Sequence, residues 1–150
     1  MNLNFSIEHF LDLSNYATDI RVARRKDTKV NSQEFFTPYS IVKRMCDMVS
    51  DEDWADPEKT WLEPAAGNGQ FVCYIIWNRI MHGIDWETTL RTLFVLELME
   101  DNVIEMKQRV LKLLDEMNVE YDKNIAEEIM EHNIVCHDFF KWNFDEWKEL

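Results

Sequence analysis

An acidic residue and two glycines stand where the chain changes from a short apolar run to a long one. In the segment LEPAAGNGQF, residues 62–71, Glu63 follows an apolar run at 60–62, and Gly67 and Gly69 precede another at 70–81. Glycine adopts a positive φ readily and lets a ligand approach the backbone, which a side chain would prevent. The N–H groups at the start of a helix point into the same space. Since the chain has three glycines in all, two in one turn indicate a cofactor-binding connection.

Polar and aromatic residues follow two further apolar runs in the same way. Glu97 comes directly after residues 93–96, and Asp138 and Phe139 come soon after residues 133–136. An ionised carboxylate at Glu97 has lone pairs for both hydroxyls of a ribose. Asp138 can accept a hydrogen bond from the exocyclic amine of adenine, and Phe139 can offer an apolar face to the ring. Together the three sites predict a pocket for an adenosyl cofactor.

Each of these residues also has a purely structural interpretation. Glu97 could be an acid near the start of the next helix, where it favours the helix dipole. Asp138 could cap a C-terminal turn, and Phe139 or Phe140 could belong to the core. The joint position of the sites after three apolar runs favours the ligand pocket over these alternatives.

Alternating extended and helical patterns explain how the sites would come together. Beyond an N-terminal helix within residues 5–20, the sequence predicts helices at 38–50, 70–81, 85–91, 101–117 and 123–131, strands at 60–62, 93–96 and 133–136, and an acidic loop at 50–58. Such alternation implies a parallel sheet with right-handed crossovers, in which ligands bind beyond the carboxyl ends of the strands. The predicted fold class is therefore α/β, a βαβαβ half of a doubly wound, Rossmann-like fold.

Two of these helices carry specific expectations. For the helix at 38–50, Thr37 is expected to cap the first turn and Pro38 to take the first helical position. The apolar residues at helical spacing in this helix are Ile41, Val42, Met45, Met48 and Val49. Those expected on the buried face of the helix at 101–117 are Val103, Ile104, Val110, Leu111, Leu114 and Met117.

The composition fits one folded domain, residues 1–150, in the cytoplasm. The chain is 46% hydrophobic, with six Trp and nine Phe, which is enough for a core. No apolar stretch approaches the roughly 20 residues of a membrane span, and the N-terminus lacks the layout of a signal peptide. Without CxxC spacing, Cys46, Cys73 and Cys136 are expected to be reduced core residues. The four histidines show no paired metal spacing, so no metal is expected.

The net charge of −13 is unevenly distributed. Residues 97–150 hold 15 Asp and Glu against 6 Lys and Arg, a balance that repels nucleic acid phosphates. The exception is a basic run of five residues, Arg21, Arg24, Arg25, Lys26 and Lys29. This run could touch DNA phosphates weakly, although short basic runs are more often solvated helix ends.

Four segments within residues 31–142 resemble, in order and spacing, the first half of the adenine-N6 DNA amino-methyltransferases of restriction-modification systems. They are QEFFTP (33–38), LEPAAGNGQF (62–71), VLELMEDNV (95–103) and IVCHDFF (134–140). The resemblance implies a methyltransferase fold that binds S-adenosyl-L-methionine, with a helical part at 1–50 and a cofactor-binding half at 59–142. The residues that it implies around the cofactor are Phe36, Thr37 and Pro38 beside the methionine part, Glu63, Ala65, Gly67 and Gly69 around the pocket, Glu97 at the ribose, Leu98 on the adenine, and Asp138 and Phe139 at the adenine amine and ring.

The chain departs from this family at the catalytic motif. The family's tetrapeptide, Asn or Asp followed by Pro, Pro and an aromatic residue, orients the target amine and stacks on the flipped base. It does not occur here, where the prolines are Pro38, Pro57 and Pro64. A sheet that stops after its third strand would also leave residues 60–62 as an exposed edge, which attracts other chains. We therefore expect no catalytic residue in this chain, and we expect the edge to be covered by the N-terminal helix, by self-association or by a protein partner.

The expected function is the S-adenosylmethionine-binding part of a DNA adenine-N6 methyltransferase that is split, completed by a partner or naturally shortened. Two alternatives stay open. One is a non-catalytic interaction or regulatory protein that keeps the fold and bears an acidic surface, and the other is an enzyme that cleaves S-adenosylmethionine itself. A nicotinamide dehydrogenase is disfavoured because EPAAGNG lacks the third spaced glycine.

Overall fold

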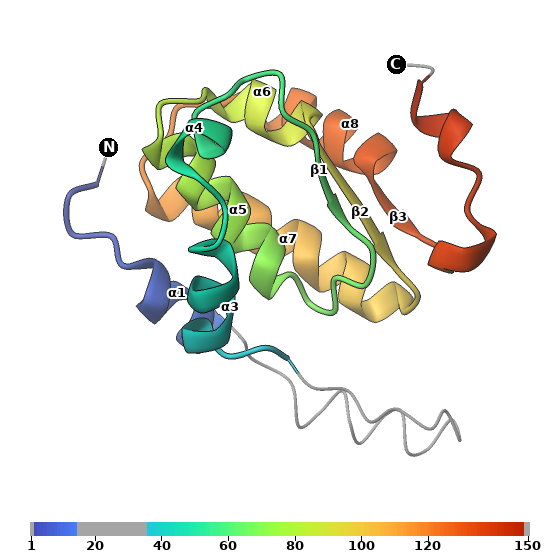
Figure 1. The fold of residues 1–150 in the computed structure, drawn as a ribbon, viewed down its shortest axis with the longest axis horizontal. Coiled ribbons are helices and arrows are strands. Elements are labelled where there is room, and N and C mark those ends of the chain that lie inside the picture. The colour runs from blue at the N-terminus through green and yellow to red at the C-terminus, as the bar shows by residue number, and fades with distance from the viewer. Residues whose placement is uncertain (1, 15–35, 149–150) are drawn as a thin grey trace.

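The fold is a small parallel sheet flanked by helices, as a computed structural model that describes residues 2–14 and 36–148 shows (Figure 1). The strands are β1 (Trp61–Glu63), β2 (Leu93–Glu97) and β3 (Ile134–Cys136), in the order β1-β2-β3. Leu62 lies beside Phe94 and Leu96 beside Val135 in the register. The α/β prediction is confirmed at this level, and the arrangement is compatible with a Rossmann-like fold.

Most helices lie within a few residues of their predicted positions. They are α1 (Ile7–Ser14), α3 (Tyr39–Cys46), α4 (Asp51–Trp54), α5 (Gln70–Met81), α6 (Trp86–Arg91), α7 (Glu100–Glu116) and α8 (Lys123–Asn133), followed by the 3₁₀ helices η1 (Phe139–Lys141) and η2 (Phe144–Lys148). The expected acidic loop at 50–58 instead contains α4. The hydroxyl of Ser50 caps this helix by accepting from the Asp53 N–H at 3.2 Å. The many acidic residues of this segment made it look like a loop in the sequence.

One side of the sheet is covered by two layers of helices (Figure 1). α7 packs against β2 and β3, α5 packs against α7, and α1 and α3 pack against α5. Val72, Ile76, Val95 and Val110 are fully buried in the core. Since its main packing partners are α5 and α3, α1 is not the expected cover for the β1 edge.

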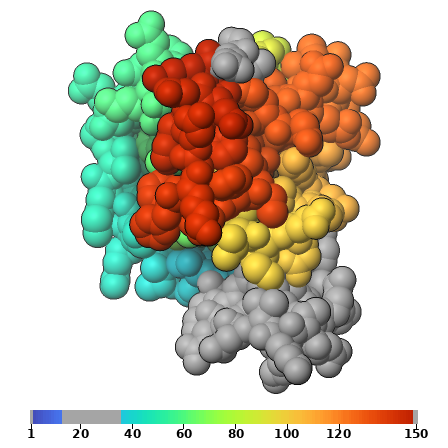
Figure 2. All heavy atoms as spheres, turned by 90° about the vertical axis from the view of Figure 1, so that its right-hand side faces the viewer, coloured from blue at the N-terminus to red at the C-terminus, as the bar shows by residue number. Residues whose placement is uncertain are grey.

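The C-terminal segment, residues 137–148, lies against the other side of the sheet, where Figure 2 shows it in red across the front. The ring of Trp147 lies 5.1 Å from that of Phe94 on β2, and its Nε1 donates to the carbonyl oxygen of His132 at 3.1 Å. β1 forms one edge of the sheet, and its Leu62 side chain is 50% exposed.

Four of the six residues that the apolar pattern predicts on the buried face of α7 and at its end are buried, namely Val103, Val110, Leu114 and Met117. Ile104, expected in the core, is 53% exposed, whereas Met106 and Leu113 are fully buried. The polar side chains of Asn102 and Arg109 are fully buried as well. Arg109 donates to the Asn68 carbonyl in the glycine turn and Asn102 donates to Glu97, so hydrophobicity alone misses these two buried polar positions.

α3 begins one residue later than expected and presents several apolar side chains to solvent. Pro38 is its N-cap, with φ −68° and ψ 156°, so Thr37 lies outside the helix and does not cap it. The side chains that α3 and the following turn leave exposed, against the predicted helical face, are Ile41, Met45 and Met48.

The remaining sequence expectations concern the basic run, membrane spans and the three cysteines. The basic run at residues 21–29 lies outside the described residues, as do residues 33–35 of the QEFFTP segment. Within residues 2–14 and 36–148, no helix combines the length and the apolarity needed to cross a membrane.

Cys46 and Cys73 are buried free thiols, as expected. Cys136 is exposed, so its assignment to the core is wrong, because it ends β3 at the open edge of the sheet.

Candidate functional site

The turn between β1 and α5 has the backbone conformation that its glycines predict. Gly67 has φ +57° and Gly69 has φ +98°. The Gly69 N–H donates to the Ala66 carbonyl at 3.0 Å, and the Ala66 N–H donates to the Leu96 carbonyl on β2 at 3.1 Å. The turn is thereby fixed to the carboxyl end of the neighbouring strand.

The two glycines serve different purposes. A Cβ at Gly69 would stand 2.7 Å from Met106 Cγ on α7, so this glycine permits the start of α5 to pack on α7. Gly69 does not line the cavity at β1, and its role in ligand approach stays a prediction. A Cβ at Gly67 would stand 3.4 Å from the Phe36 ring. Gly67 thus faces Phe36, on the side where a cavity opens.

A cavity of about 100 Å³ lies at the carboxyl end of β1. It is lined by five of the predicted cofactor residues, Phe36, Thr37, Glu63, Ala65 and Gly67, together with Ala66, Asn68, Gln70 and Phe71. Two segments that the sequence separates by more than twenty residues therefore meet here, as the motif pattern predicts. Sites for whole ligands usually enclose roughly 300–1,000 Å³, so this cavity has room for only part of a nucleoside-sized molecule.

Glu63 places a carboxyl group in this cavity. Its Oε1 accepts from the Ala65 N–H at 3.1 Å. Burial raises the pKa of Glu63, and the nearby Glu97 carboxylate raises it further, while the bond from Ala65 opposes both. A partly desolvated carboxylate gains from a cationic partner, so this wall of the cavity favours a positively charged group.

Glu97, predicted to hold a ribose, is buried and already bound by three donors. Its Oε1 accepts from the Gly67 N–H at 3.1 Å, and its Oε2 accepts from the Met99 N–H at 2.9 Å and from Asn102 Nδ2 at 3.0 Å. A carboxylate offers about four acceptor positions. The structural interpretation of Glu97, as an acid at the start of α7, therefore holds, and a ribose would have to share its remaining capacity.

A buried arginine that the sequence does not predict as a site residue connects α7 to two residues that line the cavity. Arg109 is fully buried, and its guanidinium donates to the Asn68 carbonyl at 3.0 Å and to Gln70 Oε1 at 2.6 Å. Gln70 Nε2 in turn donates to the Thr37 carbonyl at 2.9 Å. The one feature of the sequence that could have indicated this connection is Gln70, a polar residue directly after the second glycine and at the first position of α5.

Leu98 and Asp138 lie at the carboxyl ends of β2 and β3 and do not line the cavity. Leu98 is 64% exposed. Asp138 Oδ1 accepts from the Phe140 N–H at 2.9 Å and caps η1, which is its structural interpretation. The two strand ends are joined by the His137 N–H, which donates to the Glu97 carbonyl at 3.0 Å.

Phe139 is partly buried beside other aromatic rings. Its centroid lies 5.4 Å from that of Phe140 and 5.7 Å from that of Phe144. Phe140 is 90% exposed, so the alternative that it belongs to the core is wrong. Pro38 also stays outside the cavity, and its carbonyl accepts from the Ile41 and Val42 N–H groups, each at 3.1 Å.

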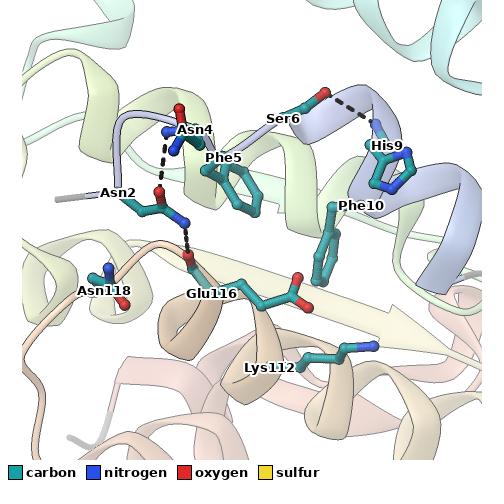
Figure 3. Close-up of a pocket in the computed structure, with 9 residues that line it drawn as sticks. All are labelled: Asn2, Asn4, Phe5, Ser6, His9, Phe10, Lys112, Glu116 and Asn118. Atoms are coloured by element: carbon teal, nitrogen blue, oxygen red, sulfur yellow. Dashed lines mark hydrogen bonds between the residues drawn. The ribbon is translucent and has the colours of Figure 1, made fainter.

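A larger cavity of about 430 Å³ lies between the N-terminal segment and the end of α7 (Figure 3). Asn2 connects the two, because its N–H donates to the Met117 carbonyl at 3.1 Å and its Nδ2 to the Glu116 carbonyl at 3.0 Å. Phe5 and Phe10 project toward α7 in this view. None of the predicted cofactor residues lines this cavity.

Neither metal chemistry nor likeness to known proteins adds to the description of the site. Within the described residues, no group of three His, Cys, Asp or Glu side chains could hold a metal ion. Comparisons of the chain with protein-family models, with curated proteins and with solved structures find no match. The functional assignment therefore rests on the chemistry of the cavity at β1.

Proposed function

We propose that this chain binds S-adenosyl-L-methionine at the cavity beyond β1, as the cofactor-binding part of a DNA adenine-N6 methyltransferase. The observation that carries the proposal is the meeting of Phe36 and Thr37 with Glu63, Ala65 and Gly67 around one space. The motif resemblance groups these residues around the cofactor, and neither their distance in sequence nor their composition requires them to meet.

The size and charge of the cavity favour the methionine part of the cofactor. About 100 Å³ suits an amino acid better than a nucleoside. The Glu63 carboxylate faces this space and gains from a cation, which the ammonium and the sulfonium of S-adenosylmethionine both supply. The adenosine would then extend over the ends of β2 and β3, where Leu98 is exposed and Phe139 is partly so.

In the complete enzyme the methyl group would pass directly from the sulfonium to the adenine amine. The contribution of this chain is to hold the donor in one orientation, because fixed geometry converts a bimolecular step into an effectively unimolecular one. The groups that orient the target amine would come from a partner or from residues other than these 150.

Calorimetric titration with S-adenosylmethionine and with its demethylated product tests the proposal. Ala65 is exposed and lines the cavity, so Ala65→Leu fills the space without disturbing the core. Ala55→Leu adds the same side chain at another exposed alanine and serves as the matched control. We expect binding in the wild type and in Ala55→Leu, and a loss of at least tenfold in affinity in Ala65→Leu. Equal affinity in all three proteins, or no binding in the wild type, would contradict the proposal.

Incubation of the chain with the cofactor in the absence of DNA separates binding from cleavage. The proposal predicts that S-adenosylmethionine is recovered intact, apart from its spontaneous breakdown in buffer. Fragments formed faster than in that buffer, and not formed by Ala65→Leu, would favour an enzyme that consumes the cofactor.

A further inference from the structure

Two polar connections from α7 reach residues that line the β1 cavity, Gly67 and Thr37. In the first, Asn102 Nδ2 donates to Glu97, and Glu97 accepts from the Gly67 N–H. In the second, Arg109 binds Gln70, and Gln70 binds the Thr37 carbonyl. Since both Thr37 and Gly67 line the cavity, its shape depends on these connections.

Arg109 is the central group of the second connection. It also donates to the Asn68 carbonyl inside the glycine turn, at 3.0 Å, so that one side chain contacts both the turn and Gln70. Its guanidinium carbon lies 5.9 Å from the centroid of the Phe10 ring on α1, which holds the group from its far side. Full burial of this cation makes its hydrogen bonds stronger and less replaceable than those of a surface arginine.

We propose that Arg109 is a positioning residue for the ligand of this cavity, and that it acts through Gln70 on Thr37. The planar guanidinium fixes the Gln70 amide, whose Nε2 then points at the Thr37 carbonyl and sets the distance of that wall from Gly67. This inference rests on the proposed function for the identity of the ligand, but the connection itself can be measured without any ligand.

Gln70→Glu breaks one half of the connection and keeps the other. The new carboxylate still accepts from Arg109 as an ion pair, but it has no N–H for the Thr37 carbonyl, and two oxygens then face each other. The matched control is Gln108→Glu, the same change at an exposed position of α7. A second pair, Arg109→Lys with Arg91→Lys as its exposed control, replaces the planar fork by a point charge.

The ligand-free readout is hydrogen exchange at the first turn of α3. The Ile41 and Val42 N–H groups bond to the Pro38 carbonyl, next to Thr37, so release of Thr37 should expose them. We expect exchange at these two amides to be about tenfold faster in Gln70→Glu, with no change at the Cys73 amide inside α5 or in Gln108→Glu. Unchanged exchange at Ile41 and Val42 would overturn the connection.

The ligand-dependent readout separates positioning from mere stability. We expect the affinity for S-adenosylmethionine to fall about tenfold in Gln70→Glu and in Arg109→Lys, with the thermal midpoint of Gln70→Glu within a few degrees of the wild type. Faster exchange with unaltered affinity would overturn the positioning role. If the wild type binds no cofactor, the proposed function and the ligand role both fail, while the exchange data still decide whether Gln70 holds Thr37.

Discussion

The carboxyl end of β1 and the carboxyl ends of β2 and β3 use the same kinds of residue differently. At β1, Glu63 binds one neighbouring N–H and still faces a cavity. At β2 and β3, Glu97 and Asp138 accept from backbone N–H groups that begin the next helix, and they line no part of that cavity. Glu97 and Asp138 are thus bound by the N–H groups of the helix that follows them, whereas Glu63, which is followed by the glycine turn, faces a cavity.

The largest expected effect is the loss of stability when Gly69, which packs against α7, is replaced by alanine. Gly69→Ala combines a positive φ, which costs roughly 1–2 kcal/mol, with a contact to Met106 that costs about as much again. Gly83→Ala also has a positive φ, but its Cβ would meet nothing within 4 Å. Urea unfolding should therefore show a loss of about 3 kcal/mol for Gly69→Ala and about half of that for Gly83→Ala. Equal losses would mean that Met106 moves aside freely.

Glu97 and Asp138, the acids that follow β2 and β3, should differ in how much stability is lost when each is replaced by alanine. Glu97→Ala removes the acceptor for three donors inside the protein and should cost about 2–4 kcal/mol of stability. Asp138→Ala removes one exposed cap and should cost at most about 1 kcal/mol. Comparable losses of unfolding free energy in chemical denaturation would contradict the distinction between the buried, triply bonded Glu97 and the helix cap Asp138.

The extension of the ligand beyond the cavity can be followed at Cys136. This exposed thiol lies beside Leu98, with its Sγ 3.5 Å from the Leu98 carbonyl oxygen. If the adenosine covers Leu98, saturating S-adenosylmethionine should slow the reaction of Cys136 with a thiol reagent several-fold, whereas methionine alone should not. Cys46, whose pKa is raised to about 12 by burial, should stay unreactive in both states. Equal rates with and without the cofactor would restrict the ligand to the β1 end.

The smallest effect is the dependence of stability on the ionisation of Glu63. Because burial raises the pKa of Glu63 in the folded chain, its protonated form stabilises the fold fully below the ordinary glutamate pKa. That contribution is lost as the pH rises through the raised value. Glu63→Gln should therefore be slightly more stable than the wild type at pH 7 and equal to it near pH 3, in thermal scans across pH. The same variant should bind S-adenosylmethionine more weakly, and a stability difference of the opposite sign would show that Glu63 is not desolvated.

The sequence predicted the framework of the fold because its signals are local. The apolar run after Gly69 gave α5 at both of its ends, and the strand and helix periods gave a parallel sheet. The group of Phe36, Thr37, Glu63, Ala65 and Gly67 also met as predicted. Glu63, Ala65 and Gly67 stand at the end of β1, and the motif resemblance groups Phe36 and Thr37 with them.

The buried polar connections could not be predicted because they depend on tertiary contacts. Asn102 and Arg109 lie on α7 at positions where a hydrophobic pattern shows nothing, yet both are fully buried against the glycine turn. The role of Gly69 depends in the same way on Met106, which lies 37 positions further along the sequence. The sequence alone does not show which distant residue a glycine, a glutamine or an arginine will contact in the fold.

Amide chemical shifts during a titration with S-adenosylmethionine test the central claim most directly, because they locate the ligand. If the cofactor binds at the carboxyl end of β1, the signals of Ala65, Ala66 and Gly67 should shift saturably with a common affinity. The same titration of Ala65→Leu should leave its Ala66 and Gly67 signals unchanged. Saturable shifts confined to the cavity between the N-terminal segment and α7, or no saturable shift at all, would contradict the account.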